Sequence, residues 1–264
     1  MSVNGSNRSR SLGKAVRNEI LSVARHFGIY ITREPDALVH EQHLRRILSG
    51  LKINCVLDVG SYHGGFAKML RRLGYIGLII SFEPMPANFE VLEEERAGDP
   101  KWRIHQLAIG AISGTETMQV FAGTSFHSFL RPSDYGLSRF PEKLHVERTE
   151  SVRVERLDNI LDDLVRDVKD PHIFLKVDTQ GYDIEVIRGL GAKVSAITAL
   201  QIEMAVNPIY NDAGNSFSEA LPYLQRLGFQ VSGLFPVSFD SDDKLQVVEF
   251  DCLMLRPRRA SESA

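Results

Sequence analysis

From about Ile53 onward, short apolar runs alternate with amphipathic segments, and this alternation constrains the fold more than any other feature of the chain. Strands that are separated by helices are typical of a mostly parallel sheet with helices on both faces. The last strand follows a turn, Phe239–Asp243, rather than a helix, so we expect it to enter the sheet antiparallel. The predicted strands are 53–58, 78–83, 102–107, 172–177, 197–203, 229–234 and 247–255, and the predicted helices are about 65–73, 86–97, 182–189 and 216–227.

Shorter segments surround this core. Glu116–Phe121 and Glu150–Val154 are predicted to be antiparallel strands that flank a long insertion. Apolar residues at helical spacing predict one helix over 14–27 and a second over 41–48. We therefore divide the chain into an N-terminal tail and helical extension (1–50), an α/β domain (51–256) and a flexible tail (257–264).

The N-terminal extension is open to two interpretations. We favour packing of the 14–27 helix on the main domain or on a second subunit, which would give a homodimer through these helices. Lys14, Arg17 and Arg25 also permit peripheral contact with a membrane surface, but their charges are too few for firm docking.

Composition excludes several classes of protein. The chain has 264 residues and a net charge of −3, which gives no general attraction to nucleic acid or to anionic lipid. Cys55 and Cys252 both lie in apolar runs and suggest neither a disulfide framework nor a zinc site. No apolar run reaches membrane-spanning length, and the N-terminus lacks a signal-peptide core. We expect a cytoplasmic protein with no nucleic-acid partner and no transmembrane segment.

The segment Val56–Gly64 predicts a ligand-binding loop, because a buried strand is followed by a glycine-rich turn and a helix. Gly60 allows a sharp turn, and Gly64 is expected to keep the start of the helix close to a ligand. The next apolar strand ends in Glu83, which is placed to accept hydrogen bonds from two adjacent ribose hydroxyls. Together these residues predict a pocket for a molecule that carries a nucleoside.

Asp58 indicates which nucleoside is bound. A dinucleotide site needs Gly-x-Gly-x-x-Gly so that backbone amides can approach a pyrophosphate, but here Asp58 stands two residues before Gly60. A carboxylate would repel a pyrophosphate and could receive the ammonium group of a ligand. S-adenosylmethionine, which has a ribose at one end and an amino acid at the other, therefore fits better than NAD. The structural alternative is that Asp58 only caps the turn.

Two later strands end in carboxylates that could act on an acceptor. Lys176 and Asp178 lie two residues apart and share a face of a strand, and Glu203 ends the next strand. One carboxylate could be a general base, or Asp178 and Glu203 could both hold a Mg²⁺ ion. The sequence leaves both options open, and Lys176–Asp178 could also be a structural ion pair. His127, in the polar and aromatic insertion segment 123–130, is an additional candidate base.

Beyond these residues, the chain resembles the FkbM family of S-adenosylmethionine-dependent methyltransferases over roughly residues 50 to 256. The blocks that carry the resemblance are Asp58-Val59-Gly60, Phe82-Glu83-Pro84, Asn88, Ala108-Ile109-Gly110, Val154-Glu155-Arg156-Leu157-Asp158, Leu175-Lys176-Val177-Asp178-Thr179-Gln180-Gly181, Gln201-Ile202-Glu203, Pro208-Ile209-Tyr210 and Gly228-Phe229. Many members of the family have Glu where this chain has Gln180 and Asp183.

The resemblance implies a class I methyltransferase fold: a Rossmann-like, three-layer α/β sandwich with a mostly parallel seven-stranded sheet and an antiparallel last strand. It also implies O-methylation, commonly of sugars on glycolipids or polysaccharides and sometimes of polyketides. The acceptor would thus be a small molecule or a glycan, and its side of the site would hold Asp178, Lys176 and Glu203. The residues expected to bind the donor are Asp58, Gly60, Ser61, Tyr62, Gly64, Glu83, Pro84, Gln106, Ala108 and Asp178.

Two alternatives remain at this point. The acceptor could be a polyketide or another natural product, although Phe126, His127, Arg131 and Tyr135 in the insertion favour a sugar. The chain could also be a binding module without activity, which the joint presence of Asp58, Glu83 and Asp178 disfavours.

Overall fold

The computed structural model describes residues 35–240 and 245–257. The contacts divide the chain into two units, Met1–His40 and Glu41–Ala264, and the following description concerns the second. The predicted helix over 14–27 lies outside the described residues. The second predicted helix is confirmed as α2 (Pro35–Gly50), and Leu44, Ile47 and Leu48 on it are buried in the core. The proposed domain limits at 50 and 256 stay a prediction.

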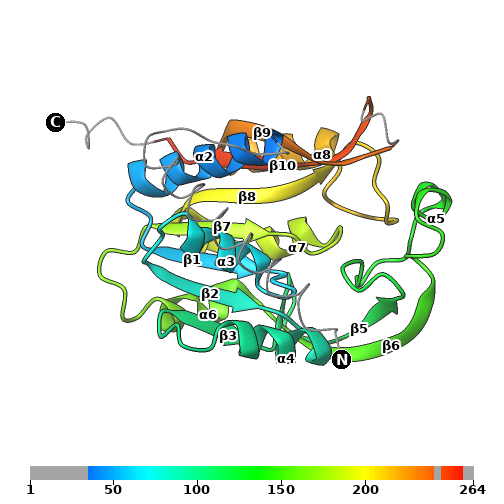
Figure 1. Cartoon of the computed structure of the whole chain (residues 1–264), viewed down its shortest axis with the longest axis horizontal. Coiled ribbons are helices and arrows are strands. Elements are labelled where there is room, and N and C mark those ends of the chain that lie inside the picture. The colour runs from blue at the N-terminus through cyan, green and yellow to red at the C-terminus, as the bar shows by residue number, and fades with distance from the viewer. Residues whose placement is uncertain (1–34, 241–244, 258–264) are drawn as a thin grey trace, which may run out of the picture. The chain divides into compact units, whose positions relative to one another are not determined.

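The second unit is built on a seven-stranded sheet with the order β3-β2-β1-β7-β8-β10-β9 (Figure 1). β10 is antiparallel to both of its neighbours, and the other pairs are parallel. The predicted sheet with an antiparallel last strand is therefore confirmed. The strands are β1 (Cys55–Val59), β2 (Leu78–Phe82), β3 (Trp102–His105), β7 (Ile173–Val177), β8 (Ile197–Ala205), β9 (Gln230–Phe239) and β10 (Val247–Leu255).

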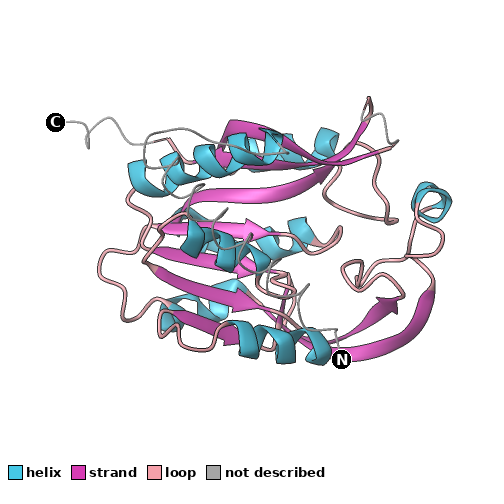
Figure 2. Ribbon diagram, viewed as in Figure 1, coloured by secondary structure: helices cyan, strands magenta, loops and turns pink. Residues whose placement is uncertain are grey.

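Helices cover both faces of the sheet and complete a three-layer sandwich (Figure 2). Side chains alternate along a strand, so Leu57 in β1 faces one layer and Val56 faces the other. Leu57 packs in a cluster with α6 (Leu157–Leu164), α7 (Asp183–Arg188) and α8 (Phe217–Arg226). Val56 packs in a cluster with α2, α3 (Gly65–Arg72) and α4 (Pro86–Glu95).

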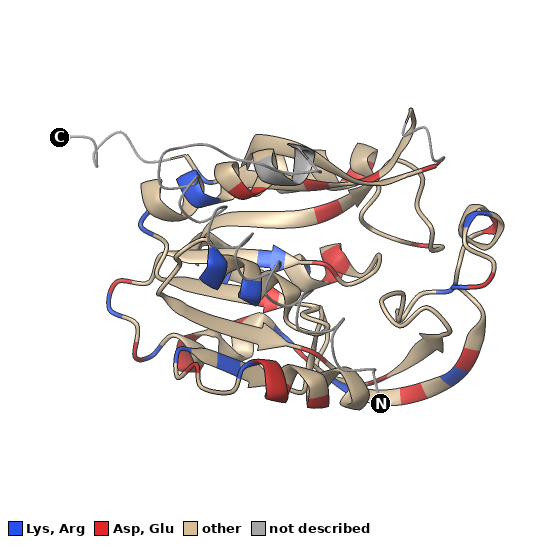
Figure 3. Cartoon of the chain, in the orientation of Figure 1, with Lys and Arg blue, Asp and Glu red and all other residues tan. Residues whose placement is uncertain are grey.

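The insertion forms a second, three-stranded sheet of order β4-β6-β5. Both predicted short strands are present, but they are longer than predicted because they continue through exposed polar residues; the charged positions along β6 are visible in Figure 3. The elements of this region are β4 (Ala108–Ile109), β5 (Gly114–Phe121), α5 (Asp134–Arg139) and β6 (Val146–Glu155). Four elements were not predicted from the sequence: α5, α6, β4 and the 3₁₀ helix η1 (Gly191–Ala196).

No helix in the described part of the chain is both long and apolar enough to cross a membrane.

Candidate functional site

A cavity of about 260 Å³ opens where the parallel strands β1, β2, β7 and β8 end, with the insertion on its opposite side. Ligands of open α/β sheets bind at these carboxyl ends. The charged positions of the central strands also lie towards this edge (Figure 3). The lining residues used below are Gly60, Tyr62, Glu83, Pro84, Ala108, Thr124, Phe126, His127, Phe129, Asp178, Gln180, Tyr182, Glu203 and Glu249.

A wider hollow lies at the opposite edge of the sheet, around Lys52, His172 and Arg256. It lies where β7 and β8 begin, which is not the edge that α/β sheets use for ligands. We therefore place the site at the carboxyl ends of the strands.

The loop after β1 lies directly against the loop after β7. Gly60 has φ +75°, and a Cβ atom on it would lie 1.9 Å from the backbone oxygen of Asp178. Only glycine tolerates both the left-handed backbone and this close approach. Gly60 therefore allows contact between the loop expected to bind the donor and the loop expected to act on the acceptor.

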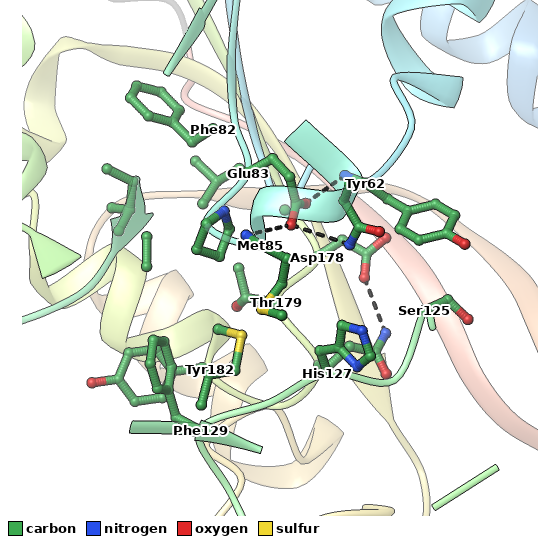
Figure 4. Close-up of a pocket in the computed structure, with 18 of the residues that line it drawn as sticks. Tyr62, Phe82, Glu83, Met85, Ser125, His127, Phe129, Asp178, Thr179 and Tyr182 are labelled. Carbon is green, nitrogen blue, oxygen red and sulfur yellow. Dashed lines mark hydrogen bonds between the residues drawn. The ribbon is translucent and has the colours of Figure 1, made fainter. Parts of the chain in front are cut away.

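Three hydrogen bonds hold the Glu83 side chain in the cavity (Figure 4). Its Oε2 accepts a hydrogen bond from the Tyr62 amide at 2.8 Å, and its Oε1 accepts from the Met85 amide at 3.0 Å and from the Asn88 side chain at 3.3 Å. The residue is only 5% exposed, and burial raises the pKa of its carboxyl to about 7. The three hydrogen bonds lower the pKa, but by less than burial raises it. Since each carboxylate oxygen offers two acceptor positions, Oε2 keeps one for a ligand.

Asp58 has a different role from the predicted one. Its side chain is fully buried, and it is not among the residues that line the cavity. Ser81 donates to Oδ2 at 3.0 Å, and the Lys176 ammonium lies 3.5 Å from Oδ1. The carboxylate is therefore occupied by partners from β2 and β7, and contact with a ligand's ammonium is not what this geometry shows.

Three further predicted donor contacts also lie away from the cavity lining. Ser61 is buried and donates to the backbone oxygen of Phe82, and Gln106 is exposed outside the cavity. Gly64 is needed for packing rather than for approach to a ligand, because a Cβ there would lie 2.6 Å from the Trp102 ring. Gly60, Tyr62, Glu83, Pro84 and Ala108 do line the cavity.

Asp178 is the carboxylate at the meeting point of the two loops. Its side chain is 38% exposed; Lys176 Nζ lies 3.3 Å from Oδ2, and Gln180 Nε2 donates to Oδ1 at 3.3 Å. Lys176 is buried behind it and also donates to the Gly60 backbone oxygen at 3.0 Å. Burial opposes the charge of Lys176, but the carboxylates of Asp178 and Asp58 raise its pKa, so it stays an ammonium. Lys176 therefore holds Asp178 and does not reach an acceptor itself.

Glu203 and Glu249 form an acidic wall next to Asp178. Burial, reinforced by Asp178 and Glu249, raises the pKa of Glu203 well above its usual range. Burial also raises the pKa of Glu249, although Ser238 donates to it at 2.8 Å. A wall of this kind can share protons and accept hydrogen bonds from hydroxyl groups.

The side chains around Asp178 and Glu203 do not fit the predicted Mg²⁺ site. Within the described residues, no three His, Cys, Asp or Glu side chains converge as metal ligands do. The Lys176 ammonium already contacts Asp178, where it would repel a second cation. We therefore derive no step through a metal.

His127 lines the cavity from the insertion, and its ring is already oriented. Nδ1 accepts a hydrogen bond from the Phe121 amide at 3.2 Å, so the ring proton lies on Nε2 in the neutral form. Burial lowers the pKa of this imidazole, which favours that neutral form. With Nδ1 occupied, His127 is placed to donate a hydrogen bond and not to take a proton as the predicted base would.

The structure also brings Thr124, Phe129 and Tyr182 to the cavity, and none of these three was predicted as a site residue. Phe129 and Tyr182 pack with ring centroids 4.9 Å apart on one wall, and the Tyr62 hydroxyl lies 2.6 Å from Thr124 Oγ1 across the mouth. Figure 4 shows Glu83 and Tyr62 above His127, Phe129 and Tyr182 in this view. Thr124 and Phe129, like His127, lie in the polar and aromatic insertion segment 123–130, whereas Tyr182 lies outside it.

The strand order, the antiparallel strand β10 and the acidic residue after β2 define a class I S-adenosylmethionine-dependent methyltransferase. The family model for the methyltransferase FkbM domain matches residues 58–231, and the chain belongs to this family. The resemblance seen in the sequence is thereby confirmed.

Solved structures share the general fold at low identity. An rRNA methylase from Streptococcus thermophilus is 11% identical with a TM-score of 0.43, and the alignment covers 83% of this chain and 96% of that chain. The precorrin-6y C5,15-methyltransferase from Geobacter metallireducens is 12% identical with a TM-score of 0.41, covering 81% of this chain and 88% of that chain. A search of curated proteins gives no match. At these scores the solved structures carry no argument about the acceptor.

Proposed function

We propose that this methyltransferase transfers its methyl group to oxygen, at a hydroxyl of a sugar in a glycolipid, polysaccharide or other glycoconjugate. The observation that carries the proposal is Asp178: a partly exposed carboxylate at the junction of the two loops, held by two donors and facing the cavity. Such a group is placed to take the proton of a hydroxyl.

Bound S-adenosylmethionine supplies an electrophilic methyl group on a sulfonium. On the donor side, Glu83 Oε2 would accept from a ribose hydroxyl, and the Gly60–Tyr62 loop would hold the methionine part. Leu107, Ala108 and Ile109 offer an apolar surface for the adenine. These residues orient the donor, which supplies much of the rate in an in-line displacement.

On the acceptor side, Asp178 would accept the hydroxyl proton as the new oxygen–carbon bond forms and the sulfonium–methyl bond breaks, with S-adenosylhomocysteine as the leaving group. His127 donates from Nε2 to a second oxygen of the acceptor, and Glu203 and Glu249 accept from neighbouring hydroxyls. Among the described residues that line the cavity there is no Lys or Arg. This composition suits a neutral polyhydroxyl acceptor and disfavours a phosphorylated one.

A polyketide or related natural product is the second candidate acceptor. It is favoured by the apolar part of the cavity, where Met85, Met118 and Phe129 lie together. The two candidates differ in the surface that they offer: a sugar offers hydroxyls to the acidic wall, and a polyketide offers a larger apolar surface to Met85, Met118 and Phe129.

The test is a screen with a methyl-labelled donor against neutral glycosides, phosphorylated sugars and macrolides. We expect label in the neutral glycosides. Asp178→Asn should lower turnover by about 100-fold or more, since general-base catalysis contributes this much, while calorimetry finds the affinity for S-adenosylhomocysteine changed by about twofold at most. Normal turnover in that variant would remove Asp178 from the mechanism.

A further inference from the structure

Gln180 stands between the proposed base and a buried tyrosine. Its Nε2 donates to Asp178 Oδ1 at 3.3 Å, and its Oε1 lies 3.2 Å from the Tyr210 hydroxyl. Tyr210 is 3% exposed, and Gln180 itself lines the cavity. The side-chain amide of Gln180 therefore connects Asp178 in the cavity with the buried Tyr210.

The backbone of Gln180 is fixed from several directions. It has a left-handed φ of +53°, which costs free energy for a residue other than glycine. The buried carboxylate of Asp183 holds this turn by accepting from the Thr179 amide at 2.9 Å and from the Gly181 amide at 3.1 Å. Ser128 in the insertion donates to the Gln180 backbone oxygen at 2.7 Å. These contacts fix the position from which the Gln180 side chain extends.

Counting protons fixes which end of the amide faces Asp178. An ionised carboxylate only accepts, so the NH₂ end must point to it and the oxygen to Tyr210. The Tyr210 hydroxyl has one proton and two acceptors, Gln180 Oε1 at 3.2 Å and the Phe126 backbone oxygen at 2.7 Å. Because the hydroxyl has a single proton, the two acceptors share it, and the shorter contact is to Phe126 in the insertion.

We propose that Gln180 is the positioning residue of Asp178. Lys176 holds Oδ2 and Gln180 holds Oδ1, so the two donors together fix the plane of the carboxylate. A single donor would leave the group free to rotate about it, and misplaced reacting groups lose rate steeply. The inference rests on the proposed function, in which Asp178 is the base.

The first experiment observes the contact without turnover. In the full-length ¹⁵N-labelled protein, the Gln180 side-chain amide signals are the pair lost in Gln180→Ala. We expect this pair to move in Asp178→Asn. The Gln119 amide, which donates to the Leu130 backbone oxygen at 2.8 Å, is the matched control and should stay in place. A Gln180 pair that does not respond to Asp178→Asn overturns the proposal.

The second experiment is a double-mutant cycle with the neutral glycoside that accepts label in the screen. Gln180→Glu keeps the shape of the side chain but sets a like charge beside Asp178, and should lower kcat by about tenfold while the glycoside KM changes by about twofold at most. Calorimetry with S-adenosylhomocysteine checks that the donor site is intact. In the Asp178→Asn background the same change should cost less than about twofold. Equal losses in both backgrounds would show a purely structural role and overturn the proposal.

Gln180→Ala, which introduces no charge, repeats the cycle if the glutamate variant does not fold. If no glycoside accepts the label, the proposed function fails, and the amide signals still decide whether Gln180 holds Asp178.

Discussion

Replacing Glu83 by Gln removes a charge from a side chain that three hydrogen bonds hold in the cavity, and it nearly preserves the shape of that side chain. In the native chain, both oxygens accept hydrogen bonds: Oε2 from Tyr62, and Oε1 from Met85 and Asn88. A glutamine has one accepting end. If that end keeps Met85 and Asn88, its NH₂ group faces the Tyr62 amide, and two donors meet.

The size of the effect follows from this mismatch. A buried donor left without a partner costs about 1–3 kcal/mol, and a ribose bound as proposed would lose its acceptor at the same oxygen. We expect the dissociation constant for S-adenosylhomocysteine to rise roughly 10- to 100-fold, since 1.4 kcal/mol is a factor of ten. Glu90→Gln makes the same chemical change at an exposed position of α4 and should leave the affinity unaltered.

The pH dependence gives a second test with a definite sign. Burial raises the pKa of Glu83 from 4.5 to about 7. Its neutral form therefore contributes stability that is fully present below about pH 4.5 and is lost as the pH rises to about 7, on the order of 3 kcal/mol. Asp183 and Asp251 also have raised pKa values of about 7, but they are present in both proteins and cancel in the difference.

The measurement compares wild type with Glu83→Gln by chemical denaturation between pH 4.5 and pH 7, and by calorimetry on both sides of pH 7. The wild type should lose more stability with rising pH than the variant. Its affinity for S-adenosylhomocysteine should rise with pH, because the ionised carboxylate has no proton to place on its oxygens and keeps the remaining acceptor position of Oε2 for a ribose hydroxyl. Parallel stability curves, or an unchanged dissociation constant, would refute the assignment of Glu83.

Three further changes test the rest of the site. Gly60→Ala should lower the melting temperature and abolish donor binding, because its Cβ would lie 1.9 Å from the Asp178 oxygen; Gly65→Ala, with nothing within 4 Å of the new atom, is the control. A Gly60 variant that binds S-adenosylhomocysteine normally would contradict the close approach. Lys176→Met should destabilise the fold by about 3–5 kcal/mol in denaturant titration, since it leaves buried Asp58 without its cation; an unchanged midpoint would argue against the ion pair. His127→Phe should raise the acceptor KM several-fold with little change in kcat, because the imidazole donates a hydrogen bond to the acceptor in the proposed function. A large fall in kcat would instead indicate that His127 is a catalytic base.

The fold could largely be predicted because each strand of the main sheet has its own pattern in the sequence. Each buried strand is a short apolar run, and most of the intervening helices show a clear pattern, so strand order and helix layers follow from few rules. The insertion was harder. β6 (Val146–Glu155) is exposed along much of its length, and its polar residues carry little strand signal. α6 was missed although Leu157, Leu161 and Leu164 have helical spacing.

The site was predicted less well, because the role of a charged side chain depends on partners that are distant in sequence. Asp58 was expected to meet a ligand, but strand pairing sets it beside Lys176, and that pair satisfies both groups inside the protein. Glu83 and Asp178 lie just past the last residues of β2 and β7, and both side chains reach the cavity. Position relative to the end of the strand does not decide the role alone, since Glu203 and Glu249 lie inside β8 and β10 and also line the cavity.

In the proposed function, the donor and the acceptor lie on two sides of the cavity, and the insertion closes the acceptor side. The donor half of the cavity comes from strand ends that the fold itself brings together. The acceptor half is closed by segment 124–129, which contacts the donor loop through Thr124 and Tyr62 and the catalytic loop through Ser128 and Gln180. The contact with the donor loop is made by Thr124, so a change of the insertion that keeps Thr124 can alter the acceptor without removing that contact. Exchanging 125–127 should therefore change which glycoside is methylated while the affinity for S-adenosylhomocysteine stays the same; loss of donor affinity in such exchanges would show that the two halves are not separable.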